Sequence, residues 1–412
     1  MARVVYISYD GMAEQLGQSQ VLPYVRGLAA MGHTFELLSF EKAPEPLRFR
    51  EPIAQGIRWT SLRYHRTPTV PATSFDLMQG QATLALLDTI SGAELIHVRS
   101  YVPCLMALPW AKLRGRPLLF DTRGTWPDQK VAAGTWSAEG GLYRGTKRIE
   151  RVLFRSASVI TTLTNAYLDY LRHDYPYASE IRSPIVVIPT CVDLERFSVD
   201  GQATLPDTTV KTLVYAGSLG GVYLDEAIGR FYLAWRRHSL ASRLLIVSKQ
   251  PPEAIRAQLA AAGAAAELVH RSATHDEVPG LLRSADAAVS LIGEGFGFVG
   301  SAPTKIGEIL AVGLPVAATP LGDLVQLLDH SEAGVIVRAL DDHTIDKAAQ
   351  RLLALAGMKS TRNTARKLAE RWYSLERAVE SYDQIYREMS KRRPHPVIPS
   401  RSATDLRWPS VL

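Results

Sequence analysis

Short apolar runs alternate with helical stretches along most of the chain, and this alternation constrains the fold more than any other feature of the sequence. The runs fall at residues 3–8, 34–40, 57–62, 94–98, 117–120, 159–163, 184–188, 211–216, 243–247, 267–270, 286–291 and 315–318. Strands that alternate with helices predict a mostly parallel sheet covered on both faces. The predicted fold class is therefore α/β, and ligands are expected beyond the carboxyl ends of the strands.

A chain of 412 residues is long enough for two domains, each with its own core. The strand–helix pattern pauses at the polar segment 199–209, which we interpret as an interdomain linker. We therefore predict a first domain over residues 1–200, a second over 210–370 and a last helix over 371–390. The tail 391–412 contains Pro and Ser without a periodic pattern and is predicted to be disordered.

Composition indicates the cellular compartment and the classes of binding partner. No apolar run approaches the roughly eighteen residues that span a bilayer, and the N-terminus lacks the layout of a secretory signal. Only two cysteines occur, Cys104 and Cys191, which suggests a reducing, cytoplasmic environment. The net charge of +6 favours anionic partners such as nucleotide diphosphates or phospholipid headgroups. No arginine-rich run interleaved with aromatic residues points to nucleic acid.

The stretch 301–315 carries the most specific chemistry. Pro303 and Thr304 form a good helix opening, and Lys305 and Glu308 then project from the same side of the first turn. The helix end and the lysine suit an anion, while the glutamate can accept hydrogen bonds from vicinal sugar hydroxyls. A diphosphate beside a ribose fits both groups. The alternative is a solvated Lys–Glu pair of little energetic value.

Two other groups of candidates follow predicted strands. Asp121 and Arg123 come directly after the run 117–120, where they form either a functional pair or a structural ion pair. Gly217 and Ser218 follow the run 211–216, and a glycine-rich turn there predicts a nest of backbone amides for phosphate.

The string Pro-Thr-Lys-Ile-x-Glu-x-Leu-Ala-x-Gly-x-Pro-Val, from Pro303 to Val316, resembles the donor-binding helix of retaining glycosyltransferases of the GT-B superfamily, family 4. More narrowly, it resembles the Pro-Thr-Lys branch of surface-polysaccharide sugar transferases. The resemblance covers about residues 3–390. It implies two Rossmann-like parallel-sheet domains that face a cleft, with a C-terminal helix that returns to the first domain.

The resemblance also implies roles for individual residues. Lys305 would lie near the donor diphosphate and Glu308 on the ribose hydroxyls. The loop after the first strand, with Gly17 and Gln18, matches a flexible family loop that covers the diphosphate. The loop 270–275, which contains Arg271, lies where relatives hold the nucleotide base.

The Asp-x-Arg-Gly segment that begins at Asp121 resembles the corresponding segment of the same branch, in a neighbourhood that lies close to the reacting carbon. Many relatives carry a histidine in this neighbourhood and none stands here, so Asp121 or Arg123 would orient donor or acceptor. The family's usual first glutamate is also missing, because Gly300 occupies the position eight before Glu308. Glu294 lies nearby at the wrong spacing.

Residues 142–155 form a basic amphipathic pattern. Such a helix can lie on an anionic membrane surface, and the lipid-linked acceptors of the family favour that interpretation. The alternative is a solvated helix face over the core.

The sequence thus predicts a retaining glycosyltransferase that moves a sugar from a nucleotide-diphospho-sugar to a lipid-linked or saccharide acceptor hydroxyl, in cell-surface polysaccharide or glycolipid biosynthesis. No Asp-x-Asp occurs, so neither a metal nor a cofactor is expected. The alternatives are a catalytically impaired nucleotide-sugar-binding scaffold, suggested by the missing glutamate and histidine, and a GT-B sugar-nucleotide epimerase.

Overall fold

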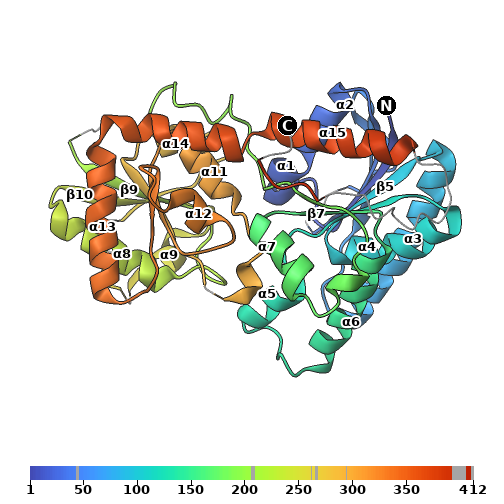
Figure 1. The fold of residues 1–412 in the computed structure, drawn as a ribbon. Helices are drawn as coiled ribbons and strands as arrows, with labels where there is room; N and C mark the ends of the chain where they lie inside the picture. The colour runs from blue at the N-terminus through green and yellow to red at the C-terminus, as the bar shows by residue number, and fades with distance from the viewer. Residues whose placement is uncertain are drawn as a thin grey trace. The chain divides into compact units, whose positions relative to one another are not determined.

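The computed structural model describes residues 1–42, 46–205, 209–260, 262–264, 268–293, 295–391 and 405–409. The chain divides into two compact units (Figure 1). Unit 1 comprises Met1–Pro189 and Leu375–Leu412, and unit 2 comprises Thr190–Ser374. The predicted boundary near residue 200 therefore lies about ten residues too late.

Unit 1 contains an eight-stranded sheet in the order β3-β4-β2-β1-β5-β6-β7-β8. Every pair is parallel except β3 with β4. The strands are β1 (Arg3–Ser8), β2 (Thr34–Glu41), β3 (Glu51–Ala54), β4 (Ile57–Arg63), β5 (Leu95–Arg99), β6 (Leu118–Asp121), β7 (Val159–Thr162) and β8 (Ile185–Val187). The sequence missed β3, a short edge strand that contains Pro52.

Helices cover both faces of this sheet. The helices of unit 1 are α1 (Gln15–Gln20), α2 (Leu22–Ala30), α3 (Thr69–Ser91), α4 (Tyr101–Arg114), α5 (Trp126–Ala132), α6 (Gly141–Ser156), α7 (Asn165–Asp169) and α15 (Leu375–Lys391). Helices α2 and α15 pack together on one face, while α3, α4 and α6 form a row on the other (Figure 1). The predicted return of the C-terminal helix to the first domain is confirmed, with α15 beginning at Leu375.

Part of the predicted disordered tail has a defined place on unit 1. Leu406 forms a parallel bridge with Val186 of β8, and Trp408 is buried. The Asn165 side chain donates to the Trp408 carbonyl at 2.9 Å and accepts from its amide at 3.1 Å. The expectation of disorder is therefore wrong for residues 405–409, while residues 392–404 and 410–412 lie outside the described part.

Unit 2 contains a six-stranded, all-parallel sheet in the order β11-β10-β9-β12-β13-β14. Its strands are β9 (Lys211–Ala216), β10 (Ser242–Val247), β11 (Leu268–Arg271), β12 (Ala287–Ser290), β13 (Val316–Ala318) and β14 (Gly334–Ile336). Its helices are α8 (Asp225–His238), α9 (Pro252–Ala260), α10 (Val278–Arg283), α11 (Thr304–Ala311), α12 (Leu324–Leu328), α13 (Asp342–Gly357) and α14 (Lys359–Trp372).

The predicted linker belongs to unit 2. Phe197, just before it, lies in the buried core of that unit, and the Val199 carbonyl accepts a hydrogen bond from Arg362 of α14. Residues 206–208 lie outside the described part. The chain instead passes between the units after Pro189 and after Ser374.

Candidate functional site

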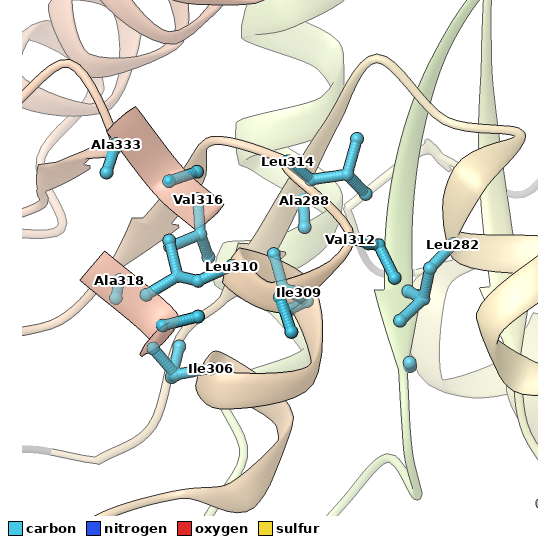
Figure 2. Close-up of a cluster of buried hydrophobic side chains, with 14 of the residues drawn as sticks. Leu282, Ala288, Ile306, Ile309, Leu310, Val312, Leu314, Val316, Ala318 and Ala333 are labelled. Atoms are coloured by element: carbon cyan, nitrogen blue, oxygen red, sulfur yellow. The ribbon is translucent and has the colours of Figure 1, made fainter. Parts of the chain in front are cut away.

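Helix α11 forms as the sequence predicts, with Pro303 as its N-cap and Thr304 as its first residue. Ile306, Ile309 and Leu310 point into the buried core of unit 2 (Figure 2). Gly313 then adopts φ +83° and ends the helix before β13. This buried face fixes the rotation of α11 and therefore the direction in which its polar residues point.

Lys305 projects from α11 onto two aromatic rings. Its Nζ lies 3.9 Å from the ring centroid of Tyr223 and 4.6 Å from that of Tyr215. It also donates to the Tyr215 hydroxyl at 3.4 Å. Among the described residues, no carboxylate forms an ion pair with this amine. Burial lowers the pKa of Lys305 to about 7, although the charge of Glu308 opposes the shift.

Glu308 lies one turn further along α11 and is partly buried. Burial raises the pKa of its carboxyl to about 7, against the opposing charges of Lys305 and Arg196. Both residues lie in α11 three positions apart, which places them on the same side of the helix. Both titrate near neutrality, as expected for polar groups that lie ready for a ligand.

Gly217 follows β9 and lies against the lysine. Its φ is +134°, and a Cβ there would stand 2.7 Å from Lys305 Nζ. Its amide donates to the Val247 carbonyl at 2.9 Å, so that N–H already has a partner. The predicted phosphate-binding amide at Gly217 is therefore wrong. What this residue provides is room for the amine.

The rest of this turn is held by polar contacts. The Ser218 carbonyl accepts from the Tyr215 hydroxyl at 2.6 Å. The Leu219 amide donates to Gln250 Oε1 at 2.6 Å, and the Gly220 amide donates to Asp225 Oδ1 at 2.8 Å. The loop beside Lys305 is thus fixed by its own side-chain partners.

Arg271 ends β11, and its exposed side chain donates to the carbonyl of His270 at 3.0 Å. Because β9 and β11 are both parallel to β10, Arg271 lies at the same edge of the sheet as Gly217. It lies at the predicted edge, and the structure shows no contact between it and Lys305.

In unit 1, Asp121 and Arg123 lie at the carboxyl end of β6, as predicted. Arg123 Nη1 is 3.6 Å from Asp121 Oδ2, and Nη2 donates to Gln20 Oε1 at 2.9 Å. Arg123 has φ +54°, a left-handed backbone that a non-glycine residue rarely adopts. Asp121 Oδ1 is buried without a hydrogen-bond partner.

Arg99 completes this network. The strand-end rule singled out the segment 97–101 that contains it, but the sequence assigned Arg99 no role. Its guanidinium donates to Asp10 Oδ2 and to Gln20 Oε1, each at 2.6 Å. Gln20 therefore accepts from both arginines. Arg99 stands beside Asp121 in the register of β5 and β6, so the strand ends themselves carry the signal.

A histidine does stand near this group, although the segment around Asp121 has none. His97 of β5 is buried, and its Nδ1 lies 2.6 Å from the Tyr386 hydroxyl of α15. Burial, followed by the charges of Arg123 and Arg99, lowers the pKa of His97 well below its ordinary value. The ring is therefore neutral, and its Nε2 has no hydrogen-bond partner.

Gly17 and Gln18 lie in α1 rather than in the predicted loop. A Cβ on Gly17 would stand 2.2 Å from the Gly11 carbonyl oxygen, so only glycine permits this close approach. Gln18 Nε2 donates to the Met12 carbonyl at 2.7 Å. Both residues therefore hold α1 against the segment that follows β1.

Two remaining predictions concern acidic groups. Gly300 is buried, and Glu294 lies outside the described residues. The described part of the chain contains no group of three or more His, Cys, Asp or Glu side chains that would hold a metal ion. The expectation of no metal stays a prediction.

Sequence profiles of two families match the chain. One, described as Glycosyltransferase Family 4, matches residues 18–196, and the other, Glycosyl transferases group 1, matches residues 210–355. The chain belongs to the glycosyltransferases. The two profiles divide this glycosyltransferase much as the two units do. A comparison with curated proteins found no matching sequence.

Solved structures share the fold of this glycosyltransferase. Sucrose-phosphate synthase from Thermosynechococcus elongatus has a TM-score of 0.71 at 17% identity, covering 94% of this chain and 99% of its own. WaaG, a glycosyltransferase involved in lipopolysaccharide biosynthesis, has a TM-score of 0.65 at 16% identity over 93% and 99%. An E. coli trehalose-6-phosphate structure bound with UDP-2-fluoro glucose has a TM-score of 0.69 at 14% identity over 96% and 100%. The predicted GT-B fold is confirmed.

Proposed function

We propose that this glycosyltransferase moves a sugar from a nucleotide-diphospho-sugar to an acceptor hydroxyl, with retention of configuration and without a metal ion. The observation that carries the proposal is the Lys305 amine, which lies at the start of α11 without a carboxylate partner among the described residues. Glu308 follows one turn later with its pKa raised by burial. The UDP-2-fluoro glucose bound by one structural relative supports a nucleotide-sugar donor.

In this reaction the bond between the anomeric carbon and the diphosphate oxygen breaks. The acceptor oxygen bonds to the same carbon on the same face, and the acceptor proton leaves with the diphosphate. Negative charge grows on the departing diphosphate, so the charge of Lys305 and the amino end of α11 stabilise the transition state. Glu308 would accept hydrogen bonds from the ribose hydroxyls and hold the donor in register.

The group at Asp121 and Arg123 would orient the transferred sugar or the acceptor. Its support is the unpartnered Asp121 Oδ1 and the neutral His97 ring, whose Nε2 is also unpartnered. Buried polar atoms without partners are rare in folded proteins and often mark a ligand site. We also propose that Gly17 and Gln18 bind the donor and that Arg271 binds its base.

A turnover assay tests the donor proposal. The purified chain is incubated with UDP-, ADP-, GDP- and TDP-sugars, with and without a bacterial lipid extract as acceptor, and nucleoside diphosphate release is measured. We expect release from one donor class, unaffected by EDTA and lost in Lys305→Ala. Release that requires added Mg²⁺, or no release from any donor, would contradict the proposal.

We further propose that the enzyme works at the cytoplasmic membrane face on a lipid-linked or saccharide acceptor in cell-surface polysaccharide or glycolipid synthesis. Helix α6 exposes Leu142, Ile149 and Val152, with Arg144 and Arg148 beside them. The described residues include no helix that is long and apolar enough to cross a membrane. Contact would therefore be peripheral, through residues 142–155.

Helix α3, in the same row as α6, adds exposed apolar residues to the proposed membrane-contact surface. It exposes Val70, Phe75, Met78, Leu86 and Ile90, and both of its acidic residues, Asp76 and Asp88, are fully buried. The acidic residue of α6, Glu150, is buried as well. The exposed charges of this row are basic, which complements an anionic lipid surface.

Sedimentation with vesicles tests this contact. We expect binding to phosphatidylglycerol vesicles, little binding to phosphatidylcholine vesicles, and loss of binding in the double variant Met78→Asp/Ile149→Asp. The exposed substitution Leu240→Asp in unit 2 is the matched control. Equal binding to both lipids, or unchanged binding in the double variant, would contradict it.

A further inference from the structure

Aromatic rings, rather than carboxylates, surround the Lys305 amine. Nζ lies 3.9 Å from the Tyr223 ring centroid and 4.6 Å from the Tyr215 ring centroid. The two rings meet edge to face, with centroids 6.0 Å apart and planes at 80°. Together they form a two-sided cradle that opens toward Gly217.

We propose that Tyr215 and Tyr223 are positioning residues that hold the Lys305 ammonium against the Gly217 turn, ready for the donor diphosphate. This inference rests on the proposed role of Lys305 in donor binding. The negative face of each ring attracts the cation. A carboxylate would hold the lysine as firmly, but the diphosphate would then have to displace it. The rings hold the amine without an opposite charge, so the ammonium form is available to the incoming anion.

The backbone around both tyrosines keeps the cradle in place. Tyr215 lies in the middle of the sheet on β9, is fully buried, and donates its hydroxyl hydrogen to the Ser218 carbonyl at 2.6 Å. Tyr223 forms an antiparallel bridge with Ile292, just after β12. The Gly293 amide donates to the Val222 carbonyl at 2.8 Å. The cradle thus joins the ends of two neighbouring strands.

Gly217 completes the geometry because it lacks a side chain. A Cβ at this position would stand 2.7 Å from Nζ and 3.8 Å from the Tyr215 hydroxyl oxygen. The amine therefore fills the space that the Cβ of any other residue at position 217 would occupy. Burial is the main cause of the lowered pKa of this amine, and the charge of Glu308 opposes the shift.

Two substitutions at Tyr223 separate this role from simple packing. Tyr223→Phe keeps the ring and loses only the hydroxyl, whereas Tyr223→Leu keeps an apolar side chain and loses the ring. The first readout is the titration of the Lys305 amine across neutral pH, followed by competitive acetylation and mass spectrometry. We expect Tyr223→Phe to match wild type and Tyr223→Leu to lower the titration midpoint by up to about one pH unit.

The second readout is affinity for UDP, ADP, GDP and TDP, measured by calorimetry. Tyr223→Leu should weaken the diphosphate that binds wild type by about five- to tenfold, and Tyr223→Phe by less than about twofold. If the leucine variant does not fold, Tyr223→Met replaces it. Equal behaviour of the phenylalanine and leucine variants in both readouts would overturn the inference.

The two readouts also distinguish this inference from the proposed function. If Lys305→Ala binds every diphosphate as wild type does, the donor role fails, yet the amine titration still tests the cradle. If Lys305→Ala loses binding while the ring variants titrate like wild type, the donor role stands and the cradle is rejected.

Discussion

The polar groups of the two units are satisfied in different ways. In unit 1, Arg99 and Arg123 share Gln20 and are paired with Asp10 and Asp121. In unit 2, neither Lys305 nor Glu308 forms an ion pair with a described residue, and the pKa of each is about 7. The charges of unit 1 lie at the carboxyl ends of parallel strands, and those of unit 2 lie on the first turns of α11. Only the charges of unit 1 have most of their partners without a ligand.

This difference separates two uses of buried charge. A buried charge is costly unless a partner offsets its lost hydration. The network of unit 1 offsets most of that cost with its own ion pairs and hydrogen bonds, although Asp121 Oδ1 has no partner. The pair on α11 does not, so a diphosphate and a ribose would complete it. The charges at the strand ends of unit 1 are therefore mostly paired without a ligand, whereas the two charges on α11 would gain their partners on binding.

The largest expected effect is on turnover in unit 2. Lys305→Ala should lower the rate of sugar transfer by about 100- to 1000-fold, because it removes the charge that opposes the departing diphosphate. Its melting temperature should not fall, because burial of the charged amine already disfavours the folded state. Lys347→Ala, which removes an exposed lysine of α13, is the control and should change neither. If Lys305→Ala lowered the melting temperature and left turnover intact, Lys305 would be a structural residue, and the contrast between the two units would fail.

The next effect is on the stability of unit 1. Arg99→Ala removes a residue that is 5% exposed and takes from the half-buried Asp10 its arginine partner. We expect the free energy of unfolding to fall by about 3 kcal/mol, measured by urea denaturation. Arg148→Ala on the exposed face of α6 should change it by less than about 0.5 kcal/mol. Similar values for both variants would show that the network contributes little.

Glu308→Gln should have a smaller effect, mainly on nucleotide binding. The substitution keeps the shape and removes the carboxylate that accepts ribose hydrogen bonds, so nucleoside diphosphate affinity should fall about tenfold. Stability should not fall, because burial already disfavours the charged form. Calorimetric titration checks the affinity, and an unchanged value would remove Glu308 from the donor site.

The smallest effect is a pH dependence of stability. The pKa of Glu308 is raised from 4.5 to about 7, so between these values the folded chain holds a proton that the unfolded chain has lost, and stability falls as pH rises. The pKa of Lys305 is lowered from 10.5 to about 7, so above 7 stability rises with pH. Relative to the double variant Lys305→Met/Glu308→Gln, the melting temperature of wild type should pass through a minimum near pH 7. A constant difference across this range would refute it.

The alternation of apolar runs predicted most of the architecture. Every predicted strand appears within one or two residues of its expected bounds, since buried parallel strands read as short apolar runs. Two strands were not predicted, each for a different reason. β3 contains a proline at the sheet edge, and β14 (Gly334–Ile336) has three residues that give no period to detect. α1 was missed because Gly17 and a polar composition are typical of a loop.

The candidate sites were only partly visible in the sequence. The helix at Lys305 and Glu308 was found because its residues lie close together in the chain. The contacts of Arg99 with Gln20, and of Lys305 with Tyr223, join residues 79 and 82 positions apart. Such pairs become neighbours only through strand order, which local patterns do not specify. For the same reason Gly217 was predicted as an amide donor when it instead provides space.

The most direct test of a donor site on α11 is thermal stabilisation by nucleoside diphosphates. The melting temperatures of wild type, Lys305→Ala and Glu308→Gln are compared with UDP, ADP, GDP and TDP, with and without EDTA. We expect one diphosphate to stabilise wild type regardless of EDTA, and both variants to lose most of that gain. Equal stabilisation of all three proteins, or none of wild type, would contradict a donor site built on the unpaired charges of α11.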